Sequence, residues 1–168
     1  NYGNIMERRY YNAGAGDQLD HIKRLRYDER GRITEWHYLS PDDKPALDPD
    51  TGCAVWKVRY RDPNDLEEAV CLDRDGKSRK LGNDGWARRK QRFGGPGELL
   101  EQAFFDPDER PILSGGYASV KYERDAFRRA TSVSYFDEEG RPGKGPDGAA
   151  ILRRRFDAAG NLRETILL

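Results

Sequence analysis

Three short acidic loops are the first residues of this sequence whose types and spacing suit a chemical role. They are DPDTG at 48–52, DRDG at 73–76 and GPDG at 145–148. Calcium takes six to eight oxygen ligands, and none of the three loops has the full spacing of a calcium-binding loop that ends in glutamate. Aspartate also caps turns with its own side chain, and glycine supplies a positive φ. We expect turns, with a calcium- or carbohydrate-binding surface module as the alternative.

A glycine-rich loop and two histidines are the other candidates for chemistry. The stretch FGGPGELL at 93–100 has the glycines of a phosphate-binding loop, but its place in the pattern described below belongs to a hairpin turn. His21 and His37 have neither a third ligand nor a fixed nucleophile beside them in the sequence. We therefore predict a protein that is not an enzyme, with no catalytic, cofactor-binding or metal-binding residue and no cofactor.

Basic residues lie next to aromatic ones in two places. Arg88-Arg89-Lys90 follows Trp86 and precedes Phe93, and Arg153-Arg154-Arg155 precedes Phe156. Such an arrangement suits single-stranded nucleic acid, where bases stack on rings and cations hold phosphates. However, 30 basic and 30 acidic residues give a net charge of zero, whereas binding to a polyanion relies on an excess of positive charge. We expect acids within the sheet to neutralise these bases, and no nucleic-acid partner.

The composition indicates a folded protein with little core. Hydrophobic residues make up 36% of the 168 residues, charged residues also 36%, and mean hydropathy is −0.99, while 11% aromatic residues argue against disorder. No stretch is long and apolar enough for a membrane span. Cys53 and Cys71 are too few for a disulfide framework or a cysteine-rich zinc site, and they leave the compartment undecided.

A repeat of about 32 residues is the strongest signal in the chain. Four glycines follow one another at intervals of 33, 31 and 32 residues: Gly52, Gly85, Gly116 and Gly148. Other positions keep the same step, with an aromatic column (Tyr27, Tyr60, Phe93, Phe156), a second column (Tyr38, Cys71, Phe104, Tyr135) and a glutamate column (Glu35, Glu68, Glu101, Glu164). The pattern predicts a single array over 1–168, with units at 20–52, 53–85, 86–116, 117–148 and partial units at 1–19 and 149–168.

Each unit contains two strand-like runs separated by turn-forming residues, which predicts a β-hairpin. We therefore expect an all-β fold in which tandem antiparallel β-hairpins form an elongated twisted ribbon or solenoid, with each unit packing on the next. Counting outward from an even-numbered turn pairs Arg24, Lys57, Lys90 and Arg153 with the four glutamates, and Lys121 with Ser132. The RDAFRRA turn of the fourth hairpin lacks glycine, so we expect it to be the least regular.

The start of the chain echoes its end, because GNIME at 3–7 matches GNLRE at 160–164. We interpret the sequence as a fragment of a larger protein with further repeats or domains. A noncatalytic repeat scaffold or protein-interaction module is the predicted function. Trp36, Trp56 and Trp86 form the candidate surface for a protein partner, since tryptophan anchors many interfaces. The competing interpretation places these three side chains in the core of the ribbon.

Two stretches, RLRYDERGRITEW at 24–36 and RRFDAAGNLRET at 154–165, resemble the tyrosine-aspartate repeats of the Rhs family. The resemblance covers one half of each unit. It implies a β-sheet ribbon that serves as a shell around a toxin or as part of a cell-surface protein. The YFDEEGRP half is also similar to MORN-type hairpin repeats. Neither resemblance implies catalytic residues.

Overall fold

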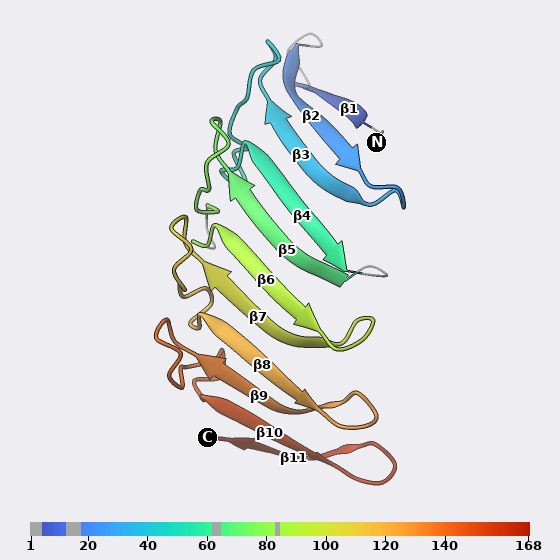
Figure 1. The fold of residues 1–168 in the computed structure, drawn as a ribbon, viewed down its shortest axis with the longest axis vertical. Helices are drawn as coiled ribbons and strands as arrows, with labels where there is room; N and C mark the ends of the chain where they lie inside the picture. The colour runs from blue at the N-terminus through green and yellow to red at the C-terminus, as the bar shows by residue number, and fades with distance from the viewer. Residues whose placement is uncertain (1–4, 13–17, 62–64, 83–84) are drawn as a thin grey trace.

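The fold is known from a computed structural model, which describes residues 5–12, 18–61, 65–82 and 85–168. Eleven strands make up one open sheet (Figure 1). Their bounds are β1 Ile5–Tyr11, β2 Leu19–Tyr27, β3 Ile33–Leu39, β4 Val55–Arg61, β5 Asp65–Leu72, β6 Arg88–Phe93, β7 Leu99–Phe105, β8 Ser119–Arg124, β9 Ala130–Phe136, β10 Ile151–Phe156 and β11 Leu162–Leu167. Gly3 and Asn4 of the GNIME echo lie outside the described residues.

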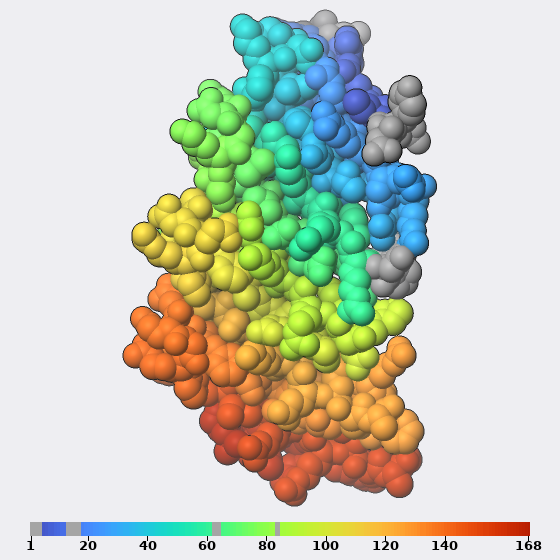
Figure 2. All heavy atoms as spheres, viewed as in Figure 1, coloured from blue at the N-terminus to red at the C-terminus, as the bar shows by residue number. Residues whose placement is uncertain are grey.

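The strands follow one another in chain order, and every neighbouring pair is antiparallel. Each strand contacts only the strands before and after it in the sequence. Short hairpin turns lie along one side of the ribbon and longer connectors along the other, with β1 and β11 at opposite ends (Figure 1). In the space-filling view, successive units form bands from blue to red (Figure 2). The all-β prediction is therefore confirmed.

The two faces of the sheet differ in chemistry because successive side chains point to opposite sides. One face, the aromatic face, contains Trp36, Trp56, Cys71, Phe104 and Tyr135 with buried aliphatic residues such as Val58, Val120, Val133 and Leu152. The other face, the charged face, contains the glutamate column and the basic residues beside it. Connector residues such as Cys53, Leu81 and Trp86 pack in the core of the aromatic face.

Where the structure describes the turn between the two strands of a unit, at 28–32, 94–98, 125–129 and 157–161, the hairpin closes with a three-residue loop and a β-bulge. In the first one, the Asp28 amide donates to the Arg32 carbonyl (2.9 Å) and the Gly31 amide donates to the Asp28 carbonyl (3.0 Å). Gly31 has a φ of 74°, which glycine adopts without steric cost. The register then shifts once more, between Arg26 and Tyr27. The same shift recurs in the other four hairpins at the strand end beside the turn.

These two single-residue shifts correct the predicted cross-strand pairs. Within its own hairpin, no glutamate of the column faces the predicted Arg24, Lys57, Lys90 or Arg153, and Lys121 does not face Ser132. Each partner lies two positions later: Arg26 faces Glu35, Arg59 faces Glu68, Arg92 faces Glu101, Glu123 faces Ser132 and Arg155 faces Glu164. Because the two shifts add to an even number, the side chains beyond the bulge stay on the expected face. Leu66, between the turn and the bulge, is shifted only once and packs with Tyr60 against the cluster of the aromatic face.

The fourth hairpin is as regular as the others, so the expectation drawn from its missing glycine is wrong. The Asp125 amide donates to the Arg129 carbonyl (3.1 Å), and Arg128 takes the glycine position with a φ of 64°. Arg124, in the place of the aromatic column, donates through its guanidinium to the carbonyls of Leu99 (3.0 and 3.1 Å) and Arg128 (2.8 Å). The bonds to Leu99 connect the fourth hairpin to the third, and the bond to Arg128 closes its own turn.

A column of alanines joins the units at the connector side. Each alanine amide donates to a carbonyl at the end of the second strand of its own unit, at 2.7–2.8 Å. The donor and acceptor pairs are Ala54 and Leu72, Ala87 and Phe105, Ala118 and Phe136, and Ala150 and Leu168. The alanine carbonyls accept from the second strand of the preceding unit, namely from the amides of Tyr38, Cys71, Phe104 and Tyr135, at 2.8–2.9 Å. The first three alanines are at most 2% exposed. The fourth, Ala150, is half-buried.

Candidate protein-interaction surface

The three tryptophans of the candidate surface lie side by side on the aromatic face. The ring centroids of Trp36 and Trp56 are 5.5 Å apart, and those of Trp56 and Trp86 are 5.6 Å apart. Trp86 is 4% exposed, whereas Trp36 and Trp56 are half-buried. All three belong to the larger apolar cluster or pack against it. The structure thus brings the three together, with one buried and two partly open to solvent.

The row of rings continues through the rest of the unit that contains Trp86 and into the next one. Trp86 contacts Phe104 (5.9 Å), Phe104 contacts Tyr117 (5.9 Å) and Tyr117 contacts Tyr135 (5.0 Å), all with tilted planes. Tilted pairs at such distances contribute about 0.5–1.5 kcal/mol each beyond the area they bury. Burial raises the pKa values of Tyr117 and Tyr135, so both hydroxyls stay neutral at physiological pH. We call the row from Trp36 to Tyr135 the ring ladder.

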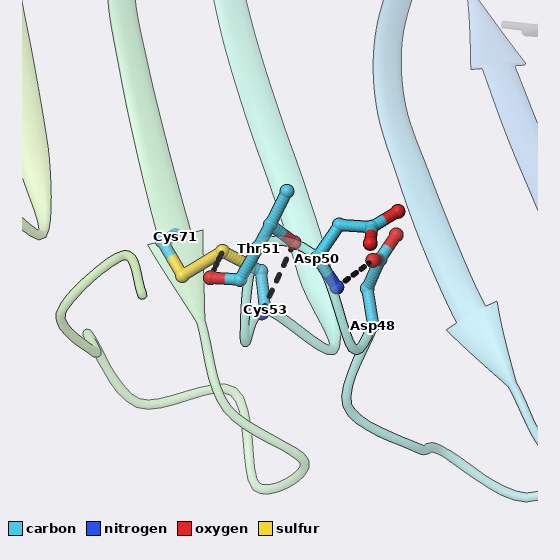
Figure 3. The surroundings of a disulfide bond; sticks show 5 residues. All are labelled: Asp48, Asp50, Thr51, Cys53 and Cys71. Atoms are coloured by element: carbon cyan, nitrogen blue, oxygen red, sulfur yellow. Dashed lines mark hydrogen bonds between the residues drawn. A yellow bond between two sulfur atoms is a disulfide. The ribbon is translucent and has the colours of Figure 1, made fainter. Parts of the chain in front are cut away.

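A disulfide between Cys53 and Cys71 lies beside the ring ladder (Figure 3). Cys53 is in the connector before β4, Cys71 is in β5, and their Cα atoms are 5.4 Å apart. Both residues are at most 3% exposed. Thr51 supports the connector end, because its hydroxyl accepts from the Cys53 amide at 3.3 Å. The pair therefore fastens the connector to the strand that follows β4.

This bond is not among the features expected from the sequence, although the repeat contains a signal for it. Moving Cys53 and Cys71 forward by 33 residues gives Trp86 and Phe104, and a further 31 residues gives Tyr117 and Tyr135. Both of those pairs are ring contacts of the ladder. Equivalent positions in neighbouring units are thus in contact, and two cysteines at such positions are within bonding distance. The disulfide replaces a ring contact in this unit.

Ion pairs cover the charged face in a repeated order of base, acid and base. Glu35 lies between Arg26 (3.6 Å) and Lys57 (3.2 Å). In the same way, Glu101 lies between Arg92 (3.2 Å) and Lys121 (3.8 Å), and Glu68 contacts Arg59 and Arg88, each at 3.5 Å. Exposed pairs of this kind contribute little stability individually. Their main effect is to match each strand to the correct neighbour.

Acids lie beside several members of the two basic runs, Arg88-Arg89-Lys90 and Arg153-Arg154-Arg155. Arg88 contacts Glu109 at 3.1 Å in addition to Glu68, and Arg155 contacts Glu164 at 3.1 Å. The Arg89 guanidinium lies over the Trp86 ring, 5.5 Å from its centroid. The expected pairing of bases with acids inside the sheet is therefore seen at these positions.

Aspartates in the loops accept hydrogen bonds from the backbone of their own turns. Asp73 Oδ1 accepts from the amides of Asp75 (2.9 Å) and Lys77 (2.8 Å). Asp48, at 6% exposure, accepts from the Asp50 amide (2.9 Å) and forms an ion pair with Lys23 (3.3 Å). Within the ranges that the structure describes, no three metal-ligating side chains form a group that could hold a metal ion. Turn formation accounts for the geometry of these carboxylates.

The remaining candidate residues also have structural neighbours. FGGPGELL closes the third hairpin, where the Gly94 amide donates to the Glu98 carbonyl at 3.0 Å. His21 stacks between Tyr10 (4.3 Å) and Tyr38 (4.7 Å) and bonds to Asp20, while His37 bonds to Glu35 (3.1 Å). His21 and His37 are therefore not brought together around a common ligand.

Comparison of the sequence with protein-family models and with curated proteins finds no match. Among the described residues, no helix is long and apolar enough to cross a membrane.

Proposed function

We propose that this chain is a noncatalytic repeat scaffold: an elongated segment of a larger protein that spaces or shields other parts and presents a surface to protein partners. The ring ladder from Trp36 to Tyr135 is the observation that supports this role. Its members contact one another across four successive units. Side chains that would carry chemistry elsewhere are used here to join one unit to the next.

The partly open tryptophans support the interaction side of this proposal. Trp36 and Trp56 are half-buried beside the buried Trp86, so their outer edges are available while their inner edges are fixed by packing. A side chain held in one conformation before binding loses little conformational entropy on binding. The resemblance to tyrosine-aspartate repeats supports the same role as a shell or surface segment.

The disulfide supports a scaffold that works outside the reducing cytosol. Structural disulfides form and persist in secreted proteins, on cell surfaces and in the periplasm, and they are rare in the cytosol. Cys53 and Cys71 are buried and lie in the core cluster, so their bond belongs to the packed structure. We therefore propose an extracytoplasmic shell or surface segment.

Thermal melting with calcium and with EDTA separates the scaffold from the calcium-binding alternative. The scaffold predicts the same melting temperature in both conditions, because the loop carboxylates already bond to their own turns. Solution X-ray scattering of the same samples is expected to show one elongated, thin particle. A melting temperature that rises with calcium and falls with EDTA would favour the surface-module alternative, and a spherical particle would contradict the scaffold.

A further inference from the structure

The outer edge of β11 has the backbone and side-chain features by which each second strand of a hairpin holds the next unit. At four earlier positions, an outward amide of the second strand donates to the carbonyl of the next alanine: the amides are those of Tyr38, Cys71, Phe104 and Tyr135. Leu167 occupies the next position of this column, 32 residues after Tyr135. The neighbouring Leu168 amide points inward and donates to the Ile151 carbonyl (2.9 Å). Leu167 and Thr165 therefore direct their amides outward.

An apolar hollow accompanies this edge. A shallow cavity of about 710 Å³ is lined on the aromatic face by Leu152, Phe156, Leu162 and Leu167, together with Asp147, Arg154 and Thr165. Leu162 and Leu167 are 53% and 54% exposed, although both lie in a strand. In the units before it, the corresponding surface is covered by the first strand and the connector of the following unit.

Charge specifies which strand fits. In the preceding units, the residue opposite the glutamate column in the next unit is basic: Lys57 faces Glu35, Lys90 faces Glu68 and Lys121 faces Glu101. Glu164 forms an ion pair with Arg155 within its own hairpin (3.1 Å), and its other side faces outward. A strand that docks in the repeated register places its lysine or arginine opposite Glu164.

We propose that the outer edge of β11 binds the first strand of a further hairpin unit of this same type. The strand has the pattern x-Ala-x-x-Lys/Arg, shared by CAVWK at 53–57, WARRK at 86–90, YASVK at 117–121 and AAILR at 149–153. Its alanine carbonyl accepts from the Leu167 amide, and its basic residue faces Glu164. This inference rests on the proposed interaction role and names the partner by its chemistry.

A second copy of residues 1–168 does not fit this edge. Within the described strands, every first strand (β2, β4, β6, β8 and β10) already pairs on both sides. The other edge strand, β1, has the sequence IMERRYY and lacks the x-Ala-x-x-Lys/Arg pattern, so a second copy has no matching strand to offer. Two β11 edges that paired about Thr165 would place Glu164 opposite Ile166, and no basic residue would face the carboxylate. The strand therefore comes from a unit outside this segment.

The direct test is binding of a synthetic peptide with the sequence of residues 117–124, YASVKYER, to the 168-residue protein. Nuclear magnetic resonance is expected to show saturable binding and slower hydrogen exchange at the amides of Thr165 and Leu167. The edge variant Thr165→Pro removes one outward amide without touching the ladder to β10, and it should abolish binding. Its matched control, Thr165→Val, keeps the amide and should bind as the unchanged protein does.

A charge exchange tests the register. The unchanged protein should prefer the lysine peptide over a peptide carrying glutamate in place of Lys121, by up to about fivefold, and Glu164→Lys should reverse that preference. The absence of peptide binding, binding that survives Thr165→Pro, an unreversed preference, or association of two copies through β11 would each overturn the inference. The calcium and scattering experiments do not depend on these outcomes. The scaffold proposal and the proposal of strand binding at β11 can therefore be refuted independently.

Discussion

At the scale of the residue, the aspartates that open three of the described hairpin turns, Asp28, Asp125 and Asp157, combine charge with backbone bonding. The pKa of Asp125 is held below its usual range, first by the hydrogen bond from the Arg129 side chain and then by turn amides. The equivalent Asp28 and Asp157 have lowered pKa values for the same kind of reason, through Arg32 and Asn161 respectively. Each carboxylate is bonded only as an acceptor, so the ionised form is the one that the folded turn stabilises.

This arrangement makes stability fall in acid. A carboxyl whose pKa is lower in the folded state contributes stability above its unfolded pKa, near 3.9, and the contribution disappears as the pH falls through the folded value. We expect the urea midpoint to drop between pH 7 and pH 3, and to drop less in Asp125→Asn, because asparagine keeps the turn acceptor without titrating. Glu138→Gln, an exposed change next to another turn, is the control. An equal drop in Asp125→Asn and the unchanged protein would refute this explanation.

Arg128 offers a second change at this scale. Its φ of 64° is occupied by glycine in the equivalent turns at Gly31, Gly97 and Gly160. A residue with a Cβ in this backbone region costs about 1–2 kcal/mol of stability relative to glycine. Part of this advantage of glycine is offset, because glycine also has more conformational freedom in the unfolded chain. Arg128→Gly should therefore raise the free energy of unfolding by about 0.5–1 kcal/mol in urea titrations. Arg128→Ala retains the Cβ and should show no such gain, so equal stabilities of the two variants would contradict the argument.

At the scale of the element, the disulfide and the ring contacts are interchangeable ways to fasten a connector to a strand. Removing the bond in Cys53→Ala/Cys71→Ala is expected to cost about 3 kcal/mol, given the 18-residue separation. Cys53→Trp/Cys71→Phe introduces the pair found one unit later and should recover part of that loss. The reversed pair, Cys53→Phe/Cys71→Trp, has the same composition in the wrong positions and should recover less. Urea midpoints under oxidising conditions measure all three, and no recovery by either ring pair would show that the positions are not equivalent.

The hairpins themselves could be predicted from the sequence, whereas their exact pairing could not. Glycine columns and alternating runs are local signals, and they located the strands and the turns. Register depends on the backbone of the turn, where a three-residue loop and a bulge each move the pairing by one residue. Arg128 shows the same limit, because its neighbours impose a glycine-like backbone on a residue that would not adopt it alone.

At the scale of the whole molecule, the sheet has one layer and grows by adding units to its edge. The two apolar clusters lie on one face, and their burial explains how a chain with 36% charged residues folds. The sequence predicted the ribbon because every unit repeats the same local pattern. It could not decide whether the tryptophans belong to core or surface, since that depends on how far each connector covers the aromatic face. The structure divides them, with Trp86 covered and the other two half-buried.

The two edge strands lie at opposite ends of the sheet, and this has a mechanical consequence. Tension applied between β1 and β11 acts along the direction in which the strands are stacked (Figure 1). Backbone hydrogen bonds of an antiparallel sheet run in that same direction. The load therefore peels strands off one after another and never shears a whole sheet at once. The disulfide between Cys53 and Cys71 limits this extension. The two cysteines are 18 residues apart in the sequence, and the segment between them cannot be extended until a reductant cleaves the bond.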